Sequence, residues 1–320
     1  MTPSQLRAYS AVARHGSVKE AAAELGVTEA AVSLHVGQLR REFSDPLFAR
    51  TASGLAFTPG GLRLASRAAE MLGLQDQTIR EVNQAGMGRR LLRVAATSLF
   101  AEHSAPGLIE LFVRRAADID VELSVRSPTS FAALLGSRAV DVAIGPEVVG
   151  PASGLVSRPF LHYQVVAVVG AGHPLAGAGE EVPSPALRDQ VWLLGPSAVT
   201  PEGAVPRLLR TLNVPETRQR IFQSHAAALE EAKRGTGVAL ALSFAVSGDV
   251  ANGRLVLLRC PELPAEGVWS TTTLPDHSVV PAASELTRFV STPRAIQAML
   301  AGTGVNVGHF RPSIHVTLWQ

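Results

Sequence analysis

Residues 17–41, SVKEAAAELGVTEAAVSLHVGQLRR, determine the predicted architecture of the N-terminal part of this chain, because they indicate two short helices joined by a tight turn. Gly26 suits the left-handed backbone that ends the first helix, and Thr28 is a typical cap for the second. Small Ala22 allows the two helices to approach closely. Apolar side chains recur at helical spacing on the facing sides, and these are Val18, Ala21, Ala22, Leu25, Val32, Val36 and Leu39. The pattern predicts a helix-turn-helix.

The opposite side of the second helix is left exposed by this packing. It carries Glu29, Ala30, Ser33, Leu34 and Gly37. In a helix-turn-helix, this side of the second helix lies in the major groove of DNA. A further helix over residues 3–14 is predicted to support the pair and to stop at Gly16, and Pro46 marks the end of the second helix.

A small hairpin is predicted over residues 47–57, with its turn around Ser53 and Gly54. Arg50 on this hairpin is positioned to contact a DNA phosphate, and the alternative is an exposed arginine on an edge strand. Residues 1–93 carry 12 Lys and Arg against 8 Asp and Glu, whereas residues 94–320 carry 17 against 19. The basic excess favours nucleic-acid binding by the N-terminal part, although a solvated surface alone would also account for it.

Residues 59–85 predict one long helix, because no proline interrupts them after Pro59 and apolar residues follow an approximate heptad pattern. The stripe consists of Leu62, Ala65, Ala69, Leu72 and Ile79. A helix of this length, about 40 Å at 1.5 Å per residue, does not bury such a stripe alone, so a partner helix is expected. The alternative is packing against its own domain. Gly86 and Gly88 then predict a hinge.

These features together resemble the LysR-type transcriptional regulators. The resemblance extends over residues 1 to about 300 and is most specific over 4–61, where QLRAYSAVARHGSVKEAAAELGVTEAAVSLHVGQLRREFSDPLFAR is followed by RTASGLAFTPGG. It implies a multidomain fold: an α-helical winged helix-turn-helix domain, a long linker helix, and a C-terminal α/β domain of two Rossmann-like subdomains that is periplasmic-binding-protein-like. The implied boundaries are 1–58 for the DNA-binding domain, 59–88 for the linker and dimerisation helix, 89–302 for the effector-binding domain, with subdomains 89–163 plus 268–302 and 164–267, and 303–320 for an unassigned tail.

The resemblance also implies the partners. They are double-stranded promoter DNA, a small-molecule effector, a second copy of the chain paired antiparallel through the linker helix, and RNA polymerase. Family members usually form homotetramers as dimers of dimers. Because a dimer places two recognition helices about 34 Å apart, a roughly palindromic site is expected. An effector bound between the two subdomains would change the DNA geometry through a hinge at 86–90.

The expected DNA contacts come from the cap residues, the exposed helix side and the hairpin. They are Ser17, Thr28, Glu29, Ala30, Ser33, Leu34, Gly37, Gln38, Arg50, Thr51 and Ser53. Where relatives commonly have Gln-Pro-Ala-Val-Ser-Arg, residues 29–34 read EAAVSL, so two familiar polar donors are missing. We expect Leu34 to contact a thymine methyl and Glu29 to accept from cytosine N4, or else to complement the helix dipole.

Residues 91–300 alternate between predicted strands and helices, which favours parallel sheets covered on both faces. Two similar α/β halves are expected, with strands near 161–170 and 268–274 crossing between them. The predicted helices include one continuous helix over 102–115 and one closing helix over 282–300. The segment 315–320, HVTLWQ, is expected either to add an edge strand or to be disordered.

Ligands of open α/β sheets bind at the carboxyl ends of strands, beside helix N-termini that favour anions. The candidate effector contacts chosen on this rule are Thr97, Ser98, Ser127, Thr129, Ser130, Gly145, Ser197, Thr200 and His225. Each is alternatively a helix cap, as Ser224 is expected to be. The resemblance favours Thr97, Ser98 and Thr129. The sequence supplies no Arg or Lys at these strand ends, so an acidic effector would depend on helix N-termini and neutral donors.

Several function classes are excluded by composition or by missing motifs. No apolar run reaches the length of a membrane span and no signal peptide is recognisable, so a cytoplasmic location without membrane contact is expected. The single Cys260 excludes an intramolecular disulfide and a multi-thiolate metal site within one chain.

Catalysis is also disfavoured. The chain has no HExxH, no GxSxG and no phosphate loop, since GAGHPLAGAG at 170–179 lacks the lysine and opens no helix. We therefore expect no cofactor, no metal and no catalytic residue. The alternative function is a small-molecule-binding or catalytic α/β protein whose N-terminal helices serve only for association.

Overall fold

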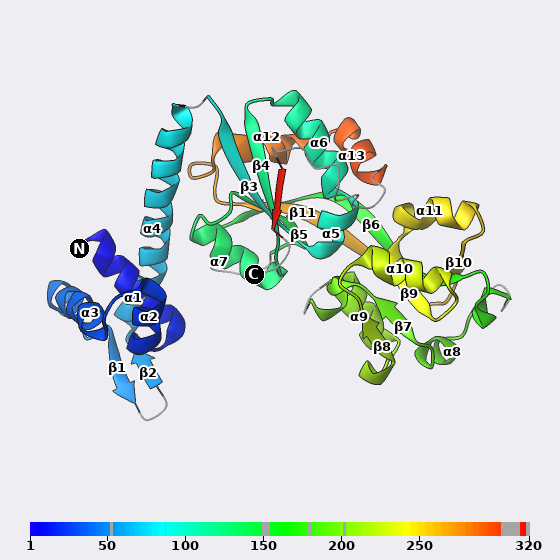
Figure 1. The fold of residues 1–320 in the computed structure, drawn as a ribbon, viewed down its shortest axis with the longest axis horizontal. Helices are drawn as coiled ribbons and strands as arrows, with labels where there is room; N and C mark the ends of the chain where they lie inside the picture. The colour runs from blue at the N-terminus through cyan, green and yellow to red at the C-terminus, as the bar shows by residue number, and fades with distance from the viewer. Residues whose placement is uncertain are drawn as a thin grey trace. The chain divides into compact units, whose positions relative to one another are not determined.

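A computed structural model describes residues 1–51, 54–86, 88–148, 154–177, 181–200, 203–301 and 314–317. The chain divides into two units (Figure 1). The first comprises Met1–Met87 with Gly136–Ala139, and the second comprises Gly88–Leu135 with Val140–Gln320.

The first unit contains the predicted helices and hairpin. They are α1 (Pro3–His15), α2 (Val18–Leu25), α3 (Glu29–Phe43), β1 (Phe48–Thr51), β2 (Gly54–Phe57) and α4 (Pro59–Ala85). The turn between α2 and α3 forms as the sequence predicts. Gly26 has a φ of 64°, and the Thr28 side chain accepts a hydrogen bond from the Ala31 backbone N–H at 3.2 Å. The helix-turn-helix prediction is therefore confirmed.

Tyr9 lies at the centre of the core of the first unit, where its side chain is fully buried. Its hydroxyl donates to the Gly61 carbonyl in the first turn of α4 at 2.9 Å. Burial, reinforced by Asp45 and opposed by Arg40, raises the pKa of Tyr9 to about 12. The hydroxyl therefore keeps its proton, and the bond from α1 to α4 is retained over the physiological pH range.

The start of α4 is also bonded to the loop that precedes the hairpin. The Thr58 N–H donates to the Leu47 carbonyl at 3.0 Å, and the Thr58 hydroxyl donates to Asp45 Oδ1 at 2.8 Å. A Cβ at Gly61 would lie 2.0 Å from the Leu47 carbonyl oxygen, so glycine is required at this position. These contacts join the long helix firmly to the helix-turn-helix.

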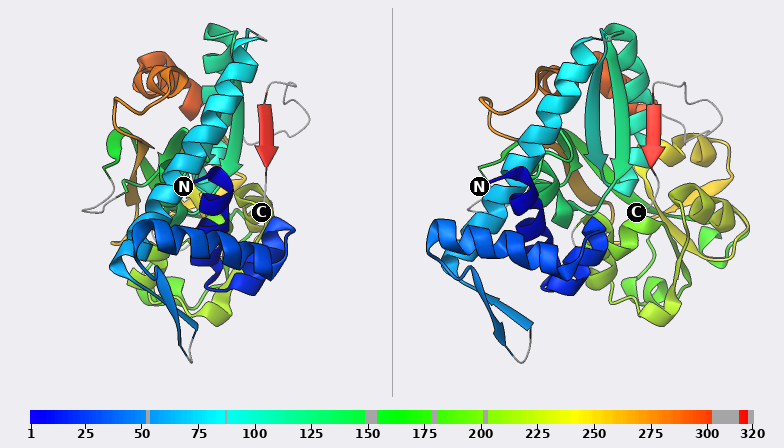
Figure 2. Two further views of the ribbon diagram at one scale, coloured as in Figure 1. Left: turned by 90° about the vertical axis from the view of Figure 1, so that its left-hand side faces the viewer. Right: turned by 60° about the vertical axis from the view of Figure 1, so that its left-hand side comes forward.

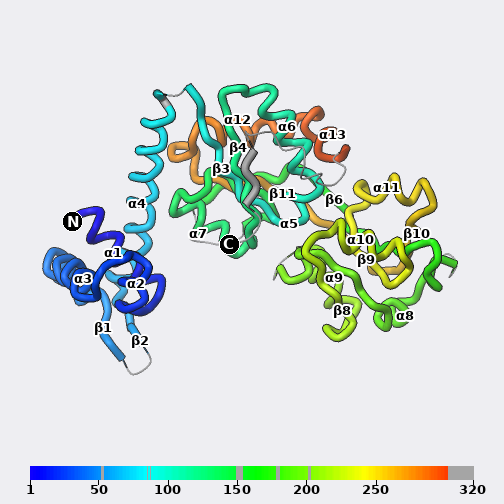
Figure 3. Tube along the Cα trace, viewed as in Figure 1, coloured from blue at the N-terminus to red at the C-terminus, as the bar shows by residue number. Residues whose placement is uncertain are grey.

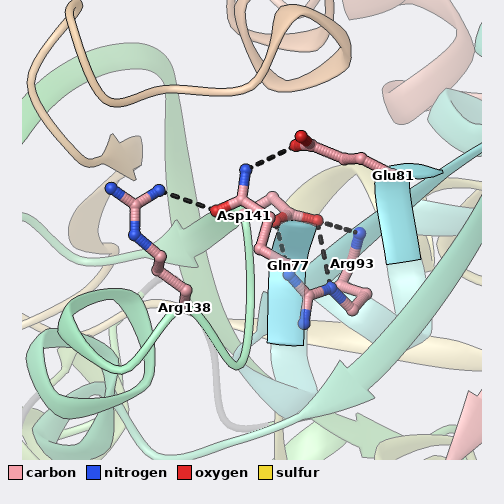
Figure 4. Close-up of polar contacts among 5 residues, drawn as sticks. All are labelled: Gln77, Glu81, Arg93, Arg138 and Asp141. Atoms are coloured by element: carbon pink, nitrogen blue, oxygen red, sulfur yellow. Dashed lines mark hydrogen bonds and ion pairs between the residues drawn. The ribbon is translucent and has the colours of Figure 1, made fainter. Parts of the chain in front are cut away.

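Figure 4 shows two polar clusters, one from each unit. In the first unit, Arg138 donates to Gln77 Oε1 at 2.7 Å, and Gln77 Nε2 donates to Glu81 at 2.6 Å. In the second unit, Arg93 is paired with Asp141 through Nη2 and Oδ1 at 2.7 Å. The buried amide of Gln77 in α4 thus has both of its polar atoms bonded, which removes the penalty for burying it.

One mixed sheet forms the second unit, in the strand order β12-β4-β3-β5-β11-β6-β9-β7-β8, with β10 paired to β6. Its strands are β3 (Arg90–Ala96), β4 (Ile119–Val125), β5 (Val142–Gly145), β6 (Val156–Gly170), β7 (Trp192–Leu194), β8 (Gln219–Ile221), β9 (Val238–Leu242), β10 (Leu255–Leu258), β11 (Ala265–Thr273) and β12 (Ile314–Thr317). We call β3, β4 and β5 the first half and β7, β8 and β9 the second half. The chain passes between the halves along β6 and returns along β11 (Figure 3).

The prediction of parallel sheets is correct within each half and wrong for the crossing strands. Strand β3 pairs parallel with β4 and β5, and β7 pairs parallel with β8 and β9. In contrast, β11 is antiparallel to both β5 and β6, and β6 is antiparallel to β9. Because β6 runs through both halves as one strand, its direction agrees with only one of them, and β11 returns against it.

Two predicted helices are broken in the structure. The helices of the second unit are α5 (Ser98–His103), α6 (Ala105–Arg115), α7 (Phe131–Gly136), α8 (Ser184–Arg188), α9 (Ala204–Thr211), α10 (His225–Lys233), α11 (Ser243–Ala251), α12 (Pro281–Phe289) and α13 (Pro293–Leu300). The predicted helix 102–115 is split at Ser104, and the predicted closing helix 282–300 is split before Pro293. Proline disfavours helical geometry in the preceding residue, and Thr292 instead caps α13.

The C-terminal segment adds a strand at the edge of the sheet. Residues Ile314–Thr317 pair parallel with β4, and Figure 2 shows β12 beside the strands of the first half. The edge-strand prediction is confirmed for these residues, while 318–320 of the predicted segment lie outside the described residues.

Candidate DNA-binding surface and ligand site

The outer side of α3 is exposed. Glu29, Ala30 and Ser33 are exposed, and the side chain of Leu34 is 58% exposed. The inner side packs into the core of the first unit through Val32, Val36 and Leu39. The helix is therefore held by one side, and the side proposed to contact DNA is accessible.

Some proposed contact residues already have hydrogen bonds within the unit. Half-buried Ser17 caps α2 by accepting from the Glu20 N–H at 3.3 Å, as Thr28 caps α3. Gln38, half-buried beside Gly37, accepts from Gln5 Nε2 at 2.8 Å. A capping hydroxyl accepts through oxygen and still has a proton to donate, so the caps remain able to bond a phosphate.

Two neighbouring arginines at the end of α3 differ in their roles. Arg40 donates to the Phe48 carbonyl at 2.9 Å, and its guanidinium lies 4.4 Å from the centre of the Phe48 ring. Arg41 is exposed, seven residues after Leu34 and so on the same side of the helix. Arg41 was not among the predicted contacts, although its spacing from Leu34 is visible in the sequence. Arg40 holds the hairpin, and Arg41 adds a cation to the exposed side.

The hairpin presents the other predicted contacts. Arg50 and Thr51 on β1 are exposed, and the Thr51 hydroxyl donates to the Gly54 carbonyl across the turn at 3.0 Å. The predicted contact Ser53 lies outside the described residues. The bond from Thr51 fixes the hairpin at its tip, so that Arg50 is presented on a short, closed strand pair.

Helix α4 exposes large apolar side chains along its length. Of the predicted stripe, Leu62 and Ile79 are exposed, Leu72 is half-buried, and Ala65 packs on the core of the first unit. Three further apolar residues outside the predicted stripe are exposed, and these are Met71, Leu74 and Val82. The predicted heptad pattern therefore includes only part of the exposed apolar surface of α4.

In the second unit the candidate effector contacts form separate groups. Thr97 is the N-cap residue of α5 and adjoins Gly145. A Cβ at Gly145 would lie 2.9 Å from the Cγ2 atom of Thr97. Ser127, Thr129 and Ser130 form a local group, with the Ser127 and Thr129 hydroxyls 2.9 Å apart and Ser130 donating to the Ser127 carbonyl at 2.7 Å.

The remaining candidates lie elsewhere. Ser98 begins α5, Thr200 ends the 3₁₀ turn Pro196–Val199, and Ser197 in that turn is bonded to His225. Ser197 and His225 are 28 positions apart in the sequence, and the structure brings them into hydrogen-bond contact.

His225, the first residue of α10, is bonded to Glu102 of α5. Its Nδ1 lies 2.7 Å from Glu102 Oε2, and its Nε2 lies 2.8 Å from the Ser197 hydroxyl. The backbone N–H groups of His225 and Ala226 also donate to the Glu102 carboxylate, at 2.8 and 2.7 Å. The carboxylate thus occupies the positive N-terminus of α10, a position that commonly binds anions.

The electrostatics of this cluster follow from its burial. Burial alone would raise the pKa of Glu102, but the hydrogen bonds and charge of His225 and the N–H groups of α10 lower it to about 2. The adjacent His103 is buried, and burial, with repulsion from His225 and partial compensation by Glu102, lowers its pKa to about 4. At neutral pH, Glu102 is therefore ionised and His103 is neutral.

Sequence reasoning missed Glu102 and His103 because both fell in the first turn of the helix predicted over 102–115. The available signal was an adjacent glutamate and histidine in the largely apolar segment 98–112, SLFAEHSAPGLIELF. It also missed Arg126, which directly follows β4 and donates its backbone N–H to the Ala96 carbonyl at 2.9 Å. The expectation that these strand ends lack a cation is therefore wrong, because Arg126 stands at the end of β4.

Two family models match this chain. The model of the LysR substrate binding domain matches residues 85–292, and that of the bacterial regulatory helix-turn-helix protein of the lysR family matches residues 3–62. The chain belongs to the LysR family of transcriptional regulators.

Individual LysR proteins resemble it along their whole length. An uncharacterised HTH-type transcriptional regulator of Mycobacterium tuberculosis is 58% identical over 324 residues and is matched over 100% of both chains. The crystal structure of ArgP from Mycobacterium tuberculosis has a TM-score of 0.61 at 18% identity and covers 93% of this chain and 97% of that one. Full-length CbnR complexed with its target DNA has a TM-score of 0.55 at 18% identity, covering 91% and 99%. At such identities the two structures support the fold alone.

Membership of the LysR family establishes the coarse function. The first unit holds the DNA-binding helix-turn-helix and the second unit holds the substrate-binding domain of a transcriptional regulator. The matched relatives are named as transcriptional regulators. Within the described ranges, every helix is too short or too polar for a membrane span.

Proposed function

We propose that this LysR regulator reads DNA with the outer side of α3 and changes its DNA geometry when a small molecule binds the second unit. The observation that carries the DNA-binding proposal is α3 itself. Its inner side is buried in the core while Ser33 and Leu34 remain exposed. We assign base contact to Glu29, Ala30, Ser33 and Leu34, and phosphate contact to the caps, the hairpin and Arg41.

A homodimer through α4 would deliver two copies of α3. This pairing is supported by the large apolar side chains that α4 exposes, which are Leu62, Met71, Leu74, Ile79 and Val82. Burying them against a second helix removes apolar surface from water. Two recognition helices about 34 Å apart match a roughly palindromic promoter site. We further propose a tetramer built from two such dimers, which acts on RNA polymerase in the cytoplasm.

We place the effector between the two halves of the second unit. Thr97, Ser98, Gly145 and the Ser127 to Ser130 group lie at strand ends of the first half, and Ser197, Thr200 and His225 lie in the second half. A ligand that binds one relative position of the halves better than another shifts the equilibrium between them. We propose no reaction there, because binding alone accounts for regulation.

The specificity of α3 is tested by selecting sites from a random DNA pool. With Leu34→Arg we expect a changed preferred base at one position in each half-site, because arginine reads guanine where leucine contacts a thymine methyl. The matched control is Leu300→Arg, an exposed leucine of α13 in the second unit, which should select the original site.

An unchanged selection by Leu34→Arg contradicts the proposed role of α3. Salt titration of the unmodified chain on its selected site provides the second readout, because phosphate contacts release counterions and make binding steeply salt-dependent. Affinity no higher than for bulk DNA would favour the alternative of a small-molecule-binding protein whose N-terminal helices serve only for association.

A further inference from the structure

Three metal-ligand side chains meet between the halves of the second unit. Glu102 and His103 come from α5, which follows β3 of the first half, and His225 begins α10, which precedes β9 of the second half. One ligand atom from each lies within 4.8 Å of the others. Among the described residues, no other group of three or more His, Cys, Asp or Glu side chains meets this condition.

The hydrogen bonds of the cluster do not explain why a histidine is buried at position 103. His103 is only 3% exposed, and its Nε2 is buried without a hydrogen-bond partner among the described residues. A buried polar atom in this state typically costs about 1–3 kcal/mol, so it calls for a partner. An apolar side chain would fill the space without this penalty, whereas imidazole is a strong metal ligand.

We propose that Glu102, His103 and His225 form a binding site for one divalent transition-metal ion of the zinc class. Two imidazoles and one carboxylate are a known donor set for zinc, with the fourth position left to water or to a ligand. Because ligand atoms around tetrahedral zinc lie roughly 3.3 Å apart, side-chain shifts of about 1 Å close the three groups around an ion. Nitrogen and oxygen donors without a thiolate also admit cobalt and nickel.

A histidine binds a metal ion through an unprotonated ring nitrogen. In the His225 tautomer whose Nδ1 donates to Glu102, coordination through this atom moves the ring proton to Nε2, where the Ser197 hydroxyl oxygen at 2.8 Å accepts it.

The surroundings hold the His225 ring in place. Ser197 bonds Nε2, as oxygen groups commonly do for metal-binding histidines, and a Cβ at Gly195 would lie 2.4 Å from His225 Cδ2. Because the ligands come from both halves, a bound ion would link the halves in this arrangement. That such an ion regulates DNA binding rests on the proposed function, whereas the metal site itself does not.

The site is tested on the full-length chain after removal of metal by a chelator. Zn²⁺ is titrated in competition with a chromogenic chelator, and we expect one ion per chain. His103→Gln should weaken this binding at least about tenfold. The matched control is His173→Gln, because His173 is also buried in the second unit but its Nδ1 accepts from the Leu175 N–H at 3.1 Å, outside the cluster.

Absence of Zn²⁺ binding, or equal affinity in His103→Gln and His173→Gln, overturns the proposal. A measurement on the unmodified chain avoids any folding defect of a variant. Co²⁺ in a four- or five-coordinate nitrogen and oxygen site gives visible absorption bands, and a spectrum of hexaaqua Co²⁺ alone overturns the proposal as well. Since neither assay contains DNA, a failure of the metal site is distinguishable from a failure of the proposed regulation.

Discussion

Two histidine and carboxylate pairs in this molecule share their chemistry and differ in their surroundings. His15 of α1, with its side chain 33% exposed, is paired with Glu24 of α2 and lies 3.6 Å from Glu20. His225, with its side chain 2% exposed, lies 2.7 Å from Glu102, which is 13% exposed. Water replaces the partner of the first pair at little cost, whereas the second pair has no such replacement. Burial therefore decides what each pair contributes, and both pairs can be tested for it.

The largest effect is expected from Glu102→Ala. It leaves the two N–H groups at the start of α10 and the buried His225 without their partner, so the free energy of unfolding of the second unit should fall by about 3–5 kcal/mol. Trp192 and Trp269 are fully buried in this unit, and their fluorescence in a urea titration reports its unfolding. The control Glu110→Ala removes an exposed ion pair with Arg114 and should lower the free energy of unfolding only slightly. An equally small loss in Glu102→Ala would contradict the comparison.

A somewhat smaller effect is expected from acid. Burial lowers the pKa of His103 from 6.5 to about 4, so its contribution is complete above pH 6.5 and is lost as the pH falls towards 4. A shift of this size corresponds to about 3 kcal/mol. The contribution of Glu102 is complete above pH 4.5 and is lost towards pH 2. The urea concentration at the midpoint of unfolding should decrease as the pH is lowered from 6.5 to 4. In His103→Gln this decrease should be smaller, and an equally steep decrease would refute the assignment.

Gly195→Ala should disturb the buried pair from the other side. Its Cβ would lie 2.4 Å from His225 Cδ2, and overpacking of this kind costs about 1–3 kcal/mol. The control is Gly248→Ala in α11, where nothing lies within 4 Å of the added Cβ. The same tryptophan signal measures both variants. If the two variants unfold alike, the position of the His225 ring is less constrained than the geometry indicates.

The smallest effect is expected at the exposed pair. Glu24→Ala removes the contacts to His15 and to Arg14, the latter at 3.2 Å, and should change the free energy of unfolding by less than about 1 kcal/mol. Far-UV circular dichroism during urea unfolding follows the helices of the first unit. A loss comparable to that of Glu102→Ala would show that exposure is not what separates the two pairs.

The distance along the sequence between contacting residues explains which structural features could be predicted. In the first unit, Thr28 caps α3 through a residue three positions away, and Gly26 ends α2 by its own backbone preference. Such local chemistry is readable from the order of residues alone. In the second unit, Glu102 and His225 are separated by 123 positions, and nothing in the local pattern of either residue indicates the other.

The same distinction applies to the fold. The alternation of strands and helices was predicted, but the direction of β6 in the second half depends on its passage through both halves. The split between α12 and α13 was readable, since Pro293 stands inside the predicted closing helix. Helical periodicity on both sides of the proline concealed it.

The hydrogen bonds at the start of α4 restrain the orientation of the helix-turn-helix relative to this helix. The Tyr9 hydroxyl donates to the Gly61 carbonyl, and the Thr58 N–H donates to the Leu47 carbonyl. We therefore expect a rotation at the C-terminal end of this 27-residue helix to turn α3 with it. Removing these hydrogen bonds, and not shortening α4, should let α3 rotate independently of the helix.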